Sequence, residues 1–111
     1  MIKVKTVILP GGQFESLRVK GHAGSGPYGH DLVCAGVSTV MIGGINALDH
    51  PESFQIFQED GLVVIKLKPK EQITNHDAVV INTMLTMLET IEQSYGDFIK
   101  LNYHSGKVKS K

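Results

Sequence analysis

The N-terminal run from Ile2 to Leu9 alternates lysine with β-branched residues, a period of two that indicates a β-strand with one apolar side. Residues 10–12 (Pro-Gly-Gly) are turn formers and end this run. A second apolar pattern begins at Phe14 and ends at Gly21. We therefore expect the chain to open with two strands joined as a hairpin.

The later apolar patterns predict two helices and three more strands. Residues 31–48 have helical spacing with Asp31 as a good N-cap, and a second helix begins near Thr74 and ends at Tyr95-Gly96. Strand-like runs lie at 54–58 and 62–67, joined by an Asp-Gly turn, with a last strand over 98–103. Residues 62–65 are apolar on both faces, as in a central strand. The order ββαββαβ predicts an α+β two-layer sandwich, a mostly antiparallel sheet with two helices.

The chain's size allows one domain, because 111 residues can bury only one modest core. Residues 105–111 are polar and basic, and we expect this tail to fray. Eleven basic and eleven acidic side chains leave no formal net charge. A neutral chain has no global field to attract RNA or an anionic membrane, so we expect no direct nucleic-acid or membrane binding.

Cysteine usage and the N-terminus predict a cytoplasmic protein. The single cysteine excludes an internal disulfide framework, and the N-terminus has no basic, apolar, cleavable segment. The longest mostly apolar run, residues 32–48, is short for a membrane span and contains polar residues and several glycines. We interpret it as a buried helix whose small residues permit a close approach by another backbone.

That single cysteine, Cys34, is the first candidate for chemistry. With Asp31 as N-cap it occupies the third helical position, where the unpaired N–H groups favour thiolate over thiol. Those N–H groups could also hold the oxyanion of a tetrahedral intermediate, provided that other side chains do not cap them. From sequence alone, a lone cysteine on an apolar helix is more often a small core residue.

His22, at the predicted strand end, is the candidate proton acceptor for the thiol. A histidine at such a position is more often a surface or capping residue. Sequence alone does not choose between it and four competitors, namely His30, His50, His76 and His104.

Two polar neighbours of Cys34 are candidate supporting residues, each with a structural alternative. Asp31 could orient His22, as the third member of a triad does, or could only cap the helix. Ser38 lies one turn after Cys34 on the same helical face. Its hydroxyl could support the site by a hydrogen bond or, as is commoner, bond back to a helix carbonyl.

The segment between His22 and His30 cannot sustain a helix or strand, because it contains Gly24, Gly26 and Gly29. It matches G-x-G-x-x-G, but the expected acidic residue falls at a helix end and the strands look antiparallel, which disfavours nucleotide binding. We expect a hinged loop with Gly21 as pivot and Tyr28 as an apolar wall over a peptide. No cysteine or histidine pair has zinc-site spacing, so no metal or cofactor is expected.

Residues 21–23 (Gly-His-Ala) and 31–38 (Asp-Leu-Val-Cys-Ala-Gly-Val-Ser) carry a resemblance to the ribosomal-processing cysteine proteases called Prp. Length and element order are similar over essentially the whole chain. The resemblance implies two helices packed on an antiparallel sheet, Cys34 as nucleophile, His22 as its partner and a homodimer. It also implies that Asp31 matters for activity.

The implied substrate is the N-terminal extension of large-subunit ribosomal protein twenty-seven, cut after paired aromatic residues during bacterial ribosome assembly. Two interpretations from other classes remain open. One is a non-catalytic module that holds an anion or RNA phosphate at the glycine-rich loop and helix N-terminus. The other is a structural ribosome-assembly factor that binds its partner without cleaving it.

Overall fold

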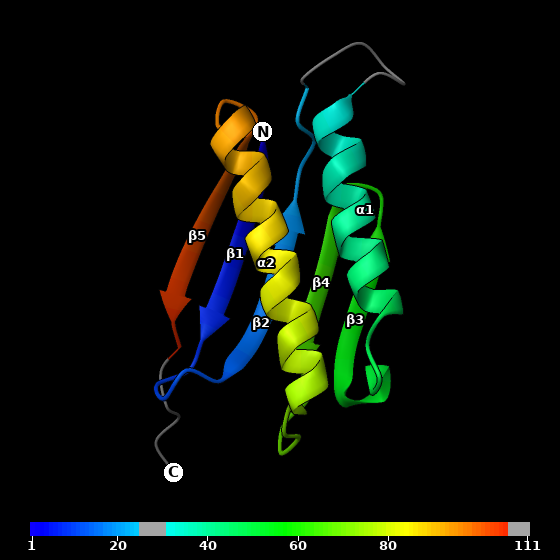
Figure 1. Ribbon diagram of the computed structural model, residues 1–111, viewed down its shortest axis with the longest axis vertical. Coiled ribbons are helices and arrows are strands. Elements are labelled where there is room, and N and C mark those ends of the chain that lie inside the picture. Colours follow the sequence, from blue (N-terminus) through cyan, green and yellow to red (C-terminus); the bar gives the residue numbers. More distant parts are fainter. Residues whose placement is uncertain (25–30, 107–111) are drawn as a thin grey trace.

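In the computed structural model, which describes residues 1–24 and 31–106, two helices lie on one face of a five-stranded sheet (Figure 1). The elements are β1 (Ile2–Ile8), β2 (Phe14–Lys20), α1 (Leu32–Asn46), the short 3-10 helix η1 (Pro51–Ser53), β3 (Phe54–Glu59), β4 (Leu62–Leu67), α2 (Asn75–Tyr95) and β5 (Ile99–Ser105). The predicted order ββαββαβ and the two-layer α+β class are confirmed.

The sheet is mixed, because one of its four strand pairs is parallel. The strand order is β3-β4-β2-β1-β5, and β1 pairs with β5 in parallel while the other pairs are antiparallel. α2 carries the chain back to the end where β1 begins, so β5 has to run in the same direction as β1 (Figure 1). The prediction of a mostly antiparallel sheet holds, with this one parallel pair added.

The core lies between the sheet and the helices. Alternate residues of β1 are buried, with Ile2, Val4 and Thr6 at 1–2% exposure, as the period of two predicts. The helices approach closely. A Cβ on Gly44 of α1 would overlap Met84 of α2. Gly44 is therefore used by α2 of the same chain, and the homodimer stays a prediction.

Both helices begin where the sequence indicates. The Asp31 carboxylate accepts the N–H of Cys34 at 3.0 Å, and the Thr74 hydroxyl accepts the N–H of Asp77 at 3.2 Å. Thr74 is the N-cap of α2, so the predicted start is correct. α1 ends at Asn46, two residues before the predicted Leu48.

The prediction that residues 32–48 form a buried helix was wrong in part, and the helices cover only one face of the sheet (Figure 1). α1 is not buried all round, since Leu32 is 72% and Ile42 is 42% exposed. β4 is paired on both sides, as expected, but Val64 is only partly buried on the uncovered face. No helix within residues 1–24 and 31–106 has both the length and the apolar character needed to cross a membrane.

Candidate active site

The end of β2, the start of α1 and the β3–β4 turn meet at one end of the molecule (Figure 1). A backbone hydrogen bond from the N–H of Gly21 to the carbonyl of Gly61, at 2.9 Å, ties the strand end to the turn. Between α1 and this turn lies a cleft of about 330 Å³, with Cys34 and Ser38 on the helix side. The structure therefore brings the predicted nucleophile to a cleft rather than into the core.

Cys34 links the helix start to the end of β2. Its thiol is free and only partly buried, and Sγ accepts a hydrogen bond from the N–H of Ala23 at 3.1 Å. Ala23 directly follows His22, so the sulfur is held next to the residue predicted as its base.

The surroundings of the thiol do not favour the thiolate, contrary to the expectation from its helical position. Burial raises the pKa of Cys34, and the Asp31 carboxylate raises it further, while the N–H groups of Ala23 and Gly24 oppose this only in part. The Asp31 carboxylate that caps the N-terminus of α1 therefore also disfavours a thiolate at Cys34.

This raised pKa predicts slow alkylation of Cys34 by iodoacetamide near neutral pH, because only the thiolate attacks. The rate is expected to rise about tenfold per pH unit until the thiol ionises, above the pH at which an ordinary cysteine does. Asp31→Asn keeps a capping side chain but removes the charge, so it should lower the pKa and speed alkylation at pH 7. A fast reaction in the wild type, unchanged by Asp31→Asn, would contradict this account.

Two N–H groups at the start of α1 already have acceptors. Cys34 donates its N–H to the Asp31 carboxylate, and Ala35 donates to the Asp31 carbonyl at 3.1 Å. These two N–H groups are therefore not free to hold an oxyanion. A carboxylate in this place also opposes the alternative in which the helix N-terminus holds a phosphate.

His22 directly follows Gly21, which lines the cleft. Its exposed ring packs against the β3–β4 turn, where a Cβ on Gly61 would lie 3.0 Å from Nε2. Among residues 1–24 and 31–106 the ring makes no hydrogen bond to Cys34.

The competing histidines lie elsewhere, as far as the structure describes them. His50 and His76 lie where α1 ends and α2 begins, at the opposite end of the helices from Cys34 (Figure 1). His104 is near the end of β5. His30 falls outside the described residues.

Ser38 lines the cleft one turn after Cys34 and is exposed. Neither expected hydrogen bond is present among the described residues. The neighbouring Thr39 makes the back-bond instead, donating its hydroxyl to the carbonyl of Ala35 at 2.8 Å. Ser38 thus lines the cleft without a hydrogen bond from its hydroxyl to another described residue.

Comparison with known proteins agrees with this geometry. A family model described as Cysteine protease Prp matches residues 1–100. The chain belongs to this cysteine protease family. The ribosomal processing cysteine protease Prp of Staphylococcus aureus strain Mu50 is 33% identical over 108 residues, which cover 93% of this chain and 99% of that protein. The Prp of Bacillus subtilis strain 168 is 30% identical over 92 residues, 78% and 82% of the two chains.

Solved Prp structures share the fold. The S. aureus Prp in complex with a covalently linked product peptide has a TM-score of 0.82 and 36% identity, over 93% of this chain and 99% of that one. The S. aureus Prp with a substrate peptide has a TM-score of 0.76 and 34% identity, with the same coverage. The similarity in sequence and in fold identifies this chain as a cysteine protease.

Gly21, the proposed pivot of this Prp family member, has a backbone conformation that requires glycine. Its φ of 108° is one that side chains rarely adopt, and a Cβ there would collide with the carbonyl of Met1. Gly24 also has a positive φ, 64°, but open space around it. The hinge itself stays a prediction, since Gly26, Tyr28 and Gly29 lie outside the described residues.

Gly21→Ala is expected to lower the free energy of unfolding by at least about 1 kcal/mol, because the residue meets both backbone strain and the Met1 carbonyl. Denaturant unfolding of the two proteins measures the difference. Gly24→Ala is the matched control, with positive φ but no collision, and should cost less. Equal losses would contradict the role assigned to the Met1 contact.

The apolar wall of the cleft is the part of the Prp site that sequence analysis missed. Val37, Met41 and Ile42 lie on α1 at three, seven and eight residues after Cys34, and so on its face. That spacing is a signal that could have identified them. The opposite wall includes Gly61 and Val63 of the β3–β4 hairpin, whose position follows from the order of the strands. The Ala23 N–H likewise had no signal in the sequence.

One group of described residues has the composition of a metal site: Asp49, His76 and Asp77 offer atoms within 4.8 Å of one another. A structural role already explains it. Asp77 is buried and accepts the N–H groups of Asp49 and His50 at 2.8 and 3.0 Å, which joins the end of α1 to α2. Burial opposes ionisation, but these bonds and His76 hold the pKa of Asp77 below its ordinary value.

Proposed function

We propose that this chain cleaves the N-terminal extension from large-subunit ribosomal protein twenty-seven in the bacterial cytoplasm, after a pair of aromatic residues. The single observation that carries the proposal is the position of Cys34, with Sγ held by the Ala23 N–H at the edge of an apolar cleft. The names of the S. aureus and B. subtilis relatives, ribosomal processing cysteine proteases, support the substrate class.

In the proposed reaction His22 takes the thiol proton as Sγ attacks the carbonyl carbon of the scissile peptide bond. The N–H groups of Ala23 and Gly24, which already favour the charged sulfur, stabilise the negative charge as it develops. His22 then gives its proton to the leaving amine, and water hydrolyses the thioester.

The walls of the cleft support the specificity for aromatic residues. Its α1 side presents Val37, Met41 and Ile42, and the hairpin side presents Leu62 and Val63. A volume of about 330 Å³ is at the small end of ligand pockets and suits one large apolar side chain. Methionine can adapt its shape to an aromatic ring. We propose that the residue before the cut occupies this space.

Incubation of the extended ribosomal protein with this chain, followed by mass spectrometry of the intact product, tests the proposal. The expected product lacks the extension, with the new N-terminus directly after the aromatic pair. The matched control substrate has both aromatic residues replaced by alanine and should remain intact. Cleavage of both would contradict the assigned specificity, and cleavage of neither would favour the non-catalytic assembly factor.

A further inference from the structure

The sheet face opposite the helices concentrates positive charge although the whole chain is neutral. β1, β2 and β4 each alternate between the covered core and this open face, and the open positions carry five exposed cations. We define the basic face by these residues: Lys3, Lys5, Arg18, Lys20 and Lys66. Two acidic residues of the described part of the chain lie on this side of the sheet: Glu15, which lines one hollow together with Lys5, Arg18 and Lys66, and Glu59 on the edge strand β3. The net charge of zero is thus the sum over two faces of the molecule that differ in charge.

The register places like charges directly opposite one another. Lys3 faces Lys20 and Lys5 faces Arg18 across β1 and β2. Such cross-strand pairs are destabilising, and no lysine or arginine within residues 1–24 and 31–106 makes an ion pair that would offset the repulsion. A bound polyanion would neutralise these pairs.

An aromatic ring continues the row of cations. Lys5 pairs in register with Arg18, Arg18 with Val64, and Val64 with Phe57, so one row crosses four strands. Phe57 is 50% exposed on the uncovered side of the sheet. Two shallow hollows, of about 230 and about 220 Å³, share Lys5 and Arg18 between them. The face therefore offers cations beside an accessible ring, on a rigid sheet.

We propose that the basic face binds single-stranded RNA, with the cations on phosphates and a base stacked on Phe57. An exposed aromatic ring on a β-sheet beside cations is the combination used for unpaired nucleotides. An acidic peptide would use the cations but not the ring. A symmetric dimer through this face would place lysine against lysine. This interaction is independent of the cleavage reaction.

Fluorescence anisotropy of a labelled twenty-nucleotide oligouridine, titrated with the full chain between 50 and 200 mM salt, tests the proposal. If all five cations contact phosphates, the logarithm of the binding constant should fall with the logarithm of salt with a slope of about −3.5. Lys5→Gln combined with Arg18→Gln should reduce that slope by about 1.4 and weaken binding at low salt by at least about tenfold. These neutral replacements remove a repulsive pair, so the variant should fold at least as well.

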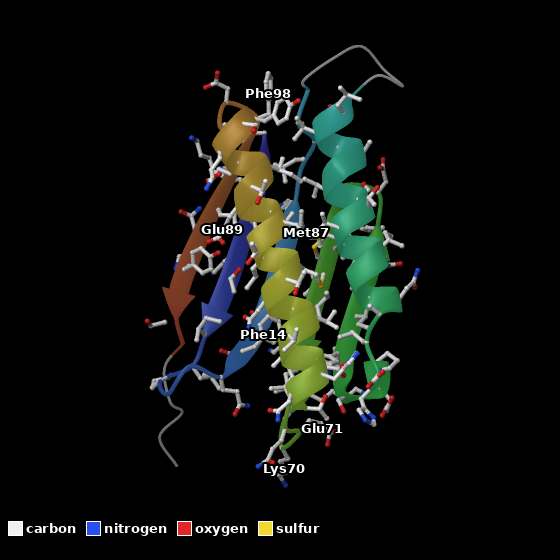
Figure 2. The ribbon with its side chains drawn as sticks, viewed as in Figure 1. Phe14, Lys70, Glu71, Met87, Glu89 and Phe98 are labelled. Atoms are coloured by element: carbon white, nitrogen blue, oxygen red, sulfur yellow. The ribbon has the colours of Figure 1, made fainter. Side chains whose placement is uncertain are left out.

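Lys70→Gln is the control, with the loss of one charge outside the basic face. Lys70 lies in the connection after β4, and Figure 2 shows it at the far end of the molecule from the start of α1. This variant should bind like the wild type. Phe57→Ala should weaken binding about tenfold without changing the salt slope, because stacking releases no counterions.

Three results would overturn the proposal. One is no saturable RNA binding at 50 mM salt, and another is equal loss in the control variant, which would indicate unspecific attraction. The third is equal affinity for polyglutamate or for phosphatidylserine vesicles with no effect of Phe57→Ala, which would assign the face to an acidic protein or a membrane. Sedimentation adds a check. If the wild type is a dimer that Lys5→Gln combined with Arg18→Gln dissociates, the basic face binds a second copy of the chain instead.

Discussion

Replacing Cys34 with alanine is expected to abolish cleavage of the extended ribosomal protein, because no other residue at the cleft can form the thioester. Cys34→Ser should also be inactive or nearly so, since its hydroxyl is far less acidic than a thiol and the site already disfavours the anion at this position. Turnover of the intact substrate, followed by mass spectrometry, measures both variants.

The fold should survive this change, which makes the result interpretable. Alanine removes one partly buried sulfur and leaves the Ala23 N–H without its acceptor, a loss of about 1 kcal/mol or less at a solvent-accessible site. Thermal unfolding and peptide binding by Cys34→Ala check that the cleft is intact. Wild-type turnover by the alanine variant would end the assignment of Cys34 as nucleophile.

Replacing His22 with alanine is expected to reduce kcat/KM by roughly 10²-fold or more, the usual worth of a positioned general acid or base. The ring packs on Gly61 in the free protein, so a merely structural role has to be separated from a chemical one. Added imidazole should restore part of the activity if His22 transfers protons. A structural loss would not respond to it.

The other histidines supply the controls for this result. Alanine at His50, His76 or His104, which lie away from the cleft, should have much smaller effects, and so should alanine at His30. His22 is misassigned if one of these four variants loses turnover while His22→Ala retains it. Loss at His22 with no imidazole rescue and a lowered unfolding temperature would instead indicate that the ring only supports the turn at Gly61.

Local patterns were sufficient to predict the elements of the fold. The period of two in β1, the caps at Asp31 and Thr74 and the Asp60-Gly61 turn each depend on neighbours in the chain, and each lies where it was predicted. The parallel pairing of β5 with β1 was not predictable in this way, because it depends on where α2 returns the chain.

The candidate site, like the fold, was predictable from the sequence only in part. The choice of residues around Cys34 followed from the sequence, because a thiol near a helix start and a glycine-rich connection are local features. The raised pKa of the thiol did not, since the burial of Cys34 and its position beside the Asp31 carboxylate exist only once the chain has folded.

By itself, then, the sequence determined the order of helices and strands, the helix caps and the position of Cys34 near a helix start, since these depend on contacts within a few residues. Only the tertiary structure decided which cleft walls lie beside the thiol, where the His22 ring packs and how the charged side chains are distributed between the two faces. Those properties arise from segments far apart in the chain. The neutral composition predicted no electrostatic attraction of RNA. Strand alternation and register nevertheless place five cations on one face, and the net charge of the chain cannot reveal this arrangement.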